Sequence, residues 1–193
     1  MEGLSAFAAT FVLVGLLELG DKTQLLLISL ATKHRPLPII AGAALGETAV
    51  TAIGVGVGAA IVAVVPVVAL KLASGALFIG IGLWNLLAKE KEATAESEGR
   101  VARNPFLATL GLAFLAELGD KTMLAVIALS GSLAAPVSVF AGASLALLTI
   151  AVVSVALGRV LKRYITARWL RVVSATLFIG AGVLTIVEAV WPG

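Results

Sequence analysis

Residues 18–23 read Glu-Leu-Gly-Asp-Lys-Thr, and the same six residues return at 117–122, 99 positions later. Both copies lie inside long apolar segments. Ionisable side chains are costly to place in lipid, so a charged cluster within a hydrophobic segment indicates a functional site. The letter-for-letter repetition makes a chance cluster an inadequate explanation.

The composition of the whole chain predicts an all-α integral membrane protein. Of its 193 residues, 60% are hydrophobic and only 13% are charged, too little polarity to cover a soluble globule of this size. A lipid bilayer is therefore the expected surrounding. Nucleic acid is not an expected partner, because no basic patch is interleaved with aromatic residues. The absence of cysteine excludes disulfides, thiolate metal ligands and thiol redox chemistry.

Six apolar segments are long enough, or nearly so, to cross about 30 Å of hydrocarbon at about 1.5 Å per residue. Each break between them carries turn or charge chemistry. We therefore predict six transmembrane helices. The segments are Leu4–Thr32, Ile39–Val64, Leu70–Leu87, Phe106–Ser130, Val137–Gly158 and Val172–Trp191.

Further matches show that the repetition extends over each half of the chain. Residues 41–43, Ala-Gly-Ala, recur at 141–143, and residues 77–80, Leu-Phe-Ile-Gly, recur at 177–180. Each half then holds three spans, and because three is odd, the second half enters the membrane from the opposite side. Such inverted-topology repeats are typical of transporters, whose site lies near the midplane between the halves. The predicted domains are a first three-helix repeat (1–87), a charged cytoplasmic linker (88–103) and a second three-helix repeat (104–193).

The basic residues predict the orientation. Eleven of the 14 Lys and Arg residues lie in the first, third and fifth loops, Lys71 alone lies on the opposite side, and Lys22 and Lys121 lie within spans. By the positive-inside rule the charged loops face the cytoplasm and both termini lie outside. Small residues at four-residue spacing, Gly42 with Gly46 and Gly54 with Gly58, predict close helix packing.

The acids of the motif predict a site for a hard cation. Three positions apart on a helix, Glu18 and Asp21 share one face, and Glu117 with Asp120 repeats the arrangement. Four carboxylates suit calcium, manganese or magnesium, although magnesium sheds its water reluctantly. Zinc, copper and iron usually recruit imidazole or thiolate, and the only histidine, His34, lies in a loop.

Other polar residues in the spans have supporting or proton-coupling roles in this interpretation. Glu47 is a fifth carboxylate within a span, and Leu147 holds the repeat-related position. A ligand or proton-relay role for Glu47 and a satisfied side chain at a helix interface both stay open. Met123 stands where the first half has Gln24, and we favour a packing methionine there over a soft ligand. The supporting set is Lys22, Thr23, Gln24, Glu47, Lys121 and Thr122.

Charge balance leads to a hypothesis of exchange. With the four carboxylates ionised and Lys22 and Lys121 protonated, the two motifs sum to two negative charges, which one divalent cation neutralises. Without the cation, burial favours protonation of the carboxylates, so release of the cation would accompany uptake of protons. The lysines pair with the carboxylates, donate to carbonyls at the span ends, or lose their protons on burial, and the sequence leaves these alternatives open.

Several other functions compete with this interpretation. The motifs would also serve as interhelical salt bridges, as part of a small-solute exporter that recognises zwitterions, or as the acidic ring of a cation channel. An intramembrane enzyme with Asp21 and Asp120 as acid and base is disfavoured, because the two motifs are equivalent and those roles need unlike environments. We therefore expect a transporter and no enzyme.

The pattern Glu-x-Gly-Asp-Lys/Arg-Ser/Thr, present twice in a six-span chain, resembles the cation/proton antiporter family that includes the Golgi manganese and calcium transporters. This resemblance implies export of Mn2+, and of Ca2+ as a further candidate, from the cytosol in exchange for protons. The cation is the substrate, and no cofactor is expected. The resemblance places the metal-binding acids at Glu18, Asp21, Glu117 and Asp120, with Thr23 and Thr122 as the motif hydroxyls.

The expected location is a prokaryotic inner membrane, since the chain shows no transit segment and its first span is retained. The expected mechanism is alternating access, with the two halves rocking about the acids. The sequence does not rank manganese against calcium. It also leaves open the proton stoichiometry, the binding of one ion or two, and whether the chain forms a homo-oligomer.

Overall fold

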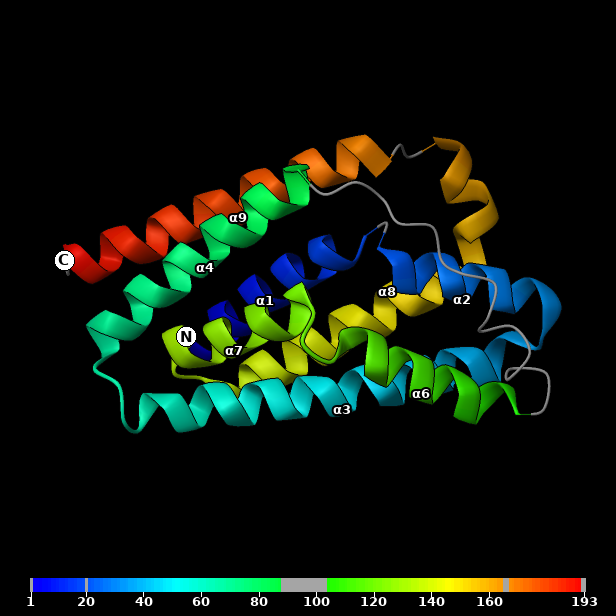
Figure 1. The fold of residues 1–193 in the computed structure, drawn as a ribbon, viewed down its shortest axis with the longest axis horizontal. Coiled ribbons are helices and arrows are strands. Elements are labelled where there is room, and N and C mark those ends of the chain that lie inside the picture. Colours follow the sequence, from blue (N-terminus) through cyan, green and yellow to red (C-terminus); the bar gives the residue numbers. More distant parts are fainter. Residues whose placement is uncertain (1, 20, 88–103, 165–166, 192–193) are drawn as a thin grey trace.

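The structure is a computed structural model that describes residues 2–19, 21–87, 104–164 and 167–191, and the regular structure in these residues is helical (Figure 1). Helices satisfy their own backbone groups, as a chain in lipid requires. The linker predicted at 88–103 lies outside the described residues. The helices are α1 (Glu2–Glu18), α2 (Lys22–Lys33), α3 (Pro36–Val62), α4 (Val67–Leu87), α6 (Pro105–Glu117), α7 (Lys121–Leu133), α8 (Pro136–Tyr164) and α9 (Ala167–Val190).

The first and fourth predicted spans are each broken into two helices. The continuous helix predicted over Leu4–Thr32 is wrong, because α1 ends at Glu18 and α2 begins at Lys22. The same break separates α6 from α7 in the second half. Both interruptions fall on the glycine-containing motif, where apolar helix-forming residues give way to Leu-Gly-Asp.

The unbroken helices agree with the prediction to within a few residues at most ends, with one clear exception. A break was predicted across Arg159–Arg171, but α8 continues to Tyr164 and α9 begins at Ala167. Arg and Lys are good helix formers, so a helix continues readily beyond its apolar segment. The basic residues of this stretch therefore belong largely to helix ends.

Helices from the two halves of the chain alternate in the bundle. Helix α1 packs against α8, while its counterpart in the second half, α6, packs against α3. Helices α4 and α9 run side by side along one flank, opposite α3 and α6 (Figure 1). One buried apolar cluster joins α1, α3, α4, α7, α8 and α9, and a second joins α2, α3, α6 and α8.

Glycines allow these helix pairs to approach closely, as the four-residue spacing predicts. A Cβ atom at Gly42 would lie 2.4 Å from the carbonyl oxygen of Phe106, and one at Gly46 would lie 2.6 Å from that of Leu110. The α3 and α6 backbones are thus in direct contact. The pair α4 and α9 meets in the same way, since a Cβ atom at Gly182 would lie 2.6 Å from the Gly75 oxygen.

The outside of the bundle is apolar, as lipid contact requires. Exposed large side chains include Trp84, Val137 and Trp191. Among the described residues, the helices long and apolar enough to cross a membrane are Pro36–Val62, Val67–Trp84 and Pro136–Ala156. The halves of the broken spans are shorter. At the end of the bundle where α4 begins and α9 ends, Lys71 and the exposed Glu188 form an ion pair of 3.3 Å.

Replacing Gly46 with alanine tests the α3–α6 contact. The added methyl group meets backbone atoms that cannot rotate away, so we expect a loss of about 1–3 kcal/mol in unfolding free energy. Gly56→Ala on the same helix is the matched control, because a Cβ atom there meets nothing within 4 Å. The measurement is the thermal unfolding midpoint in detergent, followed by tryptophan fluorescence. Equal midpoints for the two variants would contradict the contact.

Candidate metal centre

The two motif copies share a backbone hydrogen bond where their helices break. The Asp21 N–H donates to the Glu18 carbonyl over 3.1 Å, and the Asp120 N–H donates to the Glu117 carbonyl over the same distance. Gly119 has a φ of +78°, a left-handed conformation that glycine adopts without strain. This conformation explains why the second copy of the motif has glycine at position 119.

Each aspartate begins the helix that follows the break but does not cap it with its side chain. Asp21 precedes α2 and Asp120 precedes α7, both with extended backbone and without a side-chain hydrogen bond to the helix. Aspartate commonly caps at this position. Here the carboxylates remain available for other contacts, close to helix N-termini whose dipoles favour negative charge.

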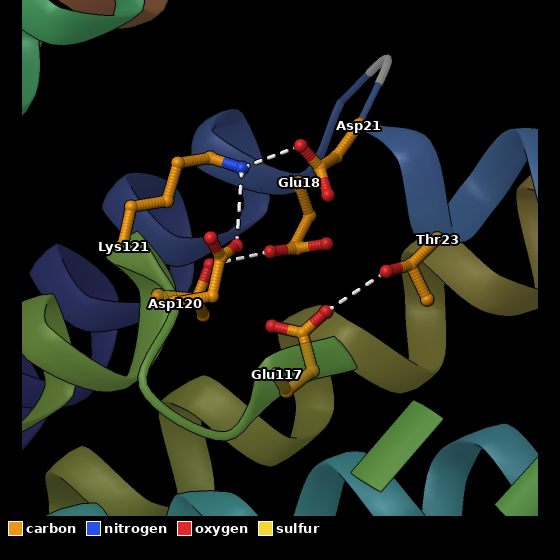
Figure 2. Close-up of polar contacts among 7 residues, drawn as sticks. Glu18, Asp21, Thr23, Glu117, Asp120 and Lys121 are labelled. Atoms are coloured by element: carbon orange, nitrogen blue, oxygen red, sulfur yellow. Dashed lines mark hydrogen bonds and ion pairs between the residues drawn. The ribbon is translucent and has the colours of Figure 1, made fainter. Parts of the chain in front are cut away.

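Three carboxylates converge between the two breaks. One oxygen each of Glu18, Asp21 and Glu117 lies within 4.8 Å of the others. Glu18 and Glu117 are each 2% exposed, and the Asp21 side chain is 17% exposed. Figure 2 shows these side chains pointing toward one another from helices far apart in the sequence. The helical face predicted for Glu18 and Asp21 is wrong, but the turn brings their carboxylates together.

Each buried glutamate accepts a hydrogen bond from the threonine of the other motif. The Thr23 hydroxyl donates to Glu117 over 3.0 Å, and the Thr122 hydroxyl donates to Glu18 over 2.5 Å. This exchange ties α2 to the end of α6 and α7 to the end of α1. The threonines therefore orient the acids across the two halves of the chain.

Lys121 links the remaining acids to this centre. Its ammonium group donates to Asp21 over 2.5 Å and lies 3.6 Å from Asp120 (Figure 2). Asp120 thus lies beside the group of three carboxylates but outside it. Lys22 begins α2, and its side chain is outside the described part of the structure.

The centre retains free ligand atoms. Asp21 Oδ2 and Glu117 Oε2 are buried and lack a hydrogen-bond partner among the described residues. Buried carboxylates this close repel one another unless a cation or protons lie between them. The donor set consists of carboxylate and hydroxyl oxygens, which hard divalent cations prefer.

Gln24 and Met123 hold repeat-related positions with different contacts. The Gln24 side-chain oxygen accepts a hydrogen bond of 2.9 Å from Ser154 on α8. Met123 Sδ instead accepts from the Gly119 N–H over 3.3 Å, next to the turn. Ser154 was missed by the sequence interpretation, because a serine among apolar residues carries no motif. Its repeat-related position is Gly54.

A comparison of the sequence with known families identifies the chain. The family model described as "Divalent cation/proton antiporter GDT1" matches residues 6–93 and again residues 105–192. The chain belongs to the GDT1 family. Members of this family transport divalent cations across membranes, so the chain is a membrane cation transporter and no enzyme.

The similarity to individual relatives covers most of the chain. A Vibrio cholerae protein named "Putative manganese exporter" is 32% identical over 91% of this chain and 88% of its own length. The GDT1-like protein sll0615 of Synechocystis is 31% identical over 91% of this chain and 93% of its own length. Protein PAM71 of Arabidopsis thaliana chloroplasts is 27% identical over 96% of this chain and 58% of its own length. No solved structure matches the chain.

Thr122→Val tests the exchange of hydrogen bonds between the motifs. The variant keeps the side-chain shape but leaves the Glu18 carboxylate without its donor. We expect the divalent-cation concentration for half-maximal transport to rise at least about tenfold, as for other hydrogen bonds to charged groups. The matched control is Thr176→Val, whose exposed hydroxyl donates only to the Val172 carbonyl of its own helix. An unchanged concentration in Thr122→Val would show that this bond does not position the acid.

Proposed function

We propose that this protein exports Mn2+ from the cytosol in exchange for protons and that it also accepts Ca2+. The observation that carries the proposal is the group of three carboxylates at facing helix breaks, formed by the buried Glu18 and Glu117 and the partly buried Asp21. Their hard oxygen atoms suit both ions. The name of the Vibrio cholerae relative supports manganese as the physiological substrate.

Proton exchange follows from the electrostatics of the emptied centre. When the cation leaves, the carboxylates remain buried and close together, with Lys121 as the described ammonium group beside them. Protons are the charges that then relieve the repulsion most readily. Exchange of one divalent cation for two protons keeps the charge of the centre constant. The match to a family of cation/proton antiporters supports this coupling.

The proposed architecture is six spans arranged as two inverted-topology repeats, residues 1–87 and 104–193, joined by a cytoplasmic linker at 88–103. The same family model matches once in each half, which supports the repeat. Broken helices at equivalent places in the two halves also favour it, because transporters bind ions at such breaks. Alternating access would expose the centre to each side in turn. In this proposal Asp120 is the fourth acid of the metal site. The residues with supporting or proton-coupling roles are Lys22, Thr23, Gln24, Glu47, Lys121 and Thr122.

The proposed location is a prokaryotic plasma membrane, with both termini outside and the charged loops in the cytoplasm. The start of α1 and the end of α9 lie at the same end of the bundle, as this topology requires (Figure 1). The distribution of Lys and Arg supports the orientation. The bacterial origin of two relatives supports a prokaryotic plasma membrane as the location.

Purified protein in liposomes with a trapped pH dye tests the function. We expect Mn2+ and Ca2+ to drive proton movement in the opposite direction and Mg2+ to do so poorly, because Mg2+ gives up its water reluctantly. Glu18→Gln should abolish the signal, since it removes a buried ligand without changing the side-chain shape. The matched control is Glu188→Gln, an exposed carboxylate remote from the centre in sequence. If the folded wild-type protein moved no protons with any of the divalent ions, the proposal would be overturned.

The same liposomes test the stoichiometry. If one divalent cation exchanges for two protons, no net charge crosses the membrane, and a potential imposed with potassium and valinomycin should leave the Mn2+ flux unchanged. The measurement is the initial Mn2+ flux at several imposed potentials. A transported current that reverses with voltage would contradict electroneutral exchange.

A further inference from the structure

A small cavity lies directly beside the three-carboxylate centre. Its volume is about 10 Å³, close to the space that one water molecule needs. It lies between α3, α7 and α8, and the end of α6 closes one side. Two of its lining residues are acids, Glu47 of α3 and Glu117 of the centre, and the others are Val50, Thr51, Thr122, Met123, Val126 and Leu147.

The two acids present unused oxygen atoms. Glu47 is 4% exposed and Glu117 is 2% exposed. Oε2 of each is buried and has no hydrogen-bond partner among the described residues. An unpartnered carboxylate oxygen is costly to bury, so two acids that each carry one and that line the same cavity indicate that it receives a ligand.

The chemistry of the cavity selects a cation. Two carboxylates repel an anion, and the small volume excludes an organic solute. Divalent cations take oxygen ligands at about 2.0–2.6 Å, closer than a hydrogen-bonded water, so a space for one water admits the ion. The polar lining side chains include the two carboxylates and the hydroxyls of Thr51 and Thr122, whose oxygen atoms suit manganese and calcium.

We propose that Glu47 and Glu117 form a second position for the transported cation, next to the three-carboxylate centre. This inference rests on the proposed function. Glu117 belongs to both positions, so an ion that moves between them keeps one carboxylate ligand throughout. The electrostatic cost of the step is therefore lower than that of releasing the ion into the apolar interior.

The second position makes an otherwise repeated site asymmetric. Leu147 holds the position related to Glu47, and it lines the same cavity as an apolar wall. The residues beyond Glu47 along α3 and beyond Thr122 along α7 lead to the end of the bundle where both helices finish (Figure 1). In the proposed orientation this end faces outward. The cation would thus reach the Glu47 position on its way out.

Glu47→Gln tests this second position in the full-length protein. The substitution keeps the size of the side chain but removes its charge, so the fold and the three-carboxylate centre remain. Mn2+ binding, measured from the electron paramagnetic resonance signal of free Mn2+, should change in Kd by less than about threefold. The Mn2+ transport rate in liposomes should fall at least about tenfold. Glu188→Gln is the control that loses an exposed carboxylate and should match the wild type.

Each result decides between explanations. Wild-type transport by Glu47→Gln would overturn the second position and leave the proposed function intact. Equal losses of binding and transport would also overturn it, because Glu47 would then belong to the first position. If Glu47→Gln fails to fold, Glu47→Asp keeps the charge on a shorter side chain and should transport at an intermediate rate, and full activity there counts against the inference. Failure of the wild-type protein to move Mn2+ would instead overturn the proposed function.

Discussion

Burial of several carboxylates at one point is the constraint on which the rest of this structure depends. Glu18 and Glu117 are almost fully enclosed, and each needs donors that its own helix cannot supply. The donors come from the other half of the chain, through Thr23 and Thr122. The helix breaks lie at the same place, so α2 and α7 begin beside the acids, where the positive ends of their dipoles favour negative charge.

The sequence predicted that Glu18, Asp21 and Glu117 belong to one candidate site, because a charged motif that is repeated within apolar segments indicates a functional site. It also predicted the close contact through Gly42 and Gly46, since small residues at regular spacing have a direct packing consequence. It did not predict that Glu18 and Asp21 flank a break in the helix. Period and spacing describe a continuous helix, and the glycine alone does not say whether the helix bends or stops.

Contacts between segments that are distant in the chain could not be predicted from the sequence. The motif names Lys121 and both aspartates, but only the packing of α1 and α7 shows that Lys121 pairs with Asp21 and that Asp120 lies outside the group of three. Ser154 and the cavity beside Glu47 depend on how α8 and α3 cross the broken helices. Such crossings are set by side-chain packing over the whole interface, which a local pattern does not encode.

The glycine contacts between α3 and α6 and between α4 and α9 have a consequence for how the protein changes shape. Each of these close pairs takes one helix from each half of the chain, and backbone contacts of this kind do not slide apart without losing their packing. In the proposed alternating access, the moving units are therefore expected to be these mixed pairs, with α3 moving together with α6, and not the two sequence halves. The sequence repeats and the closely packed helix pairs therefore do not coincide.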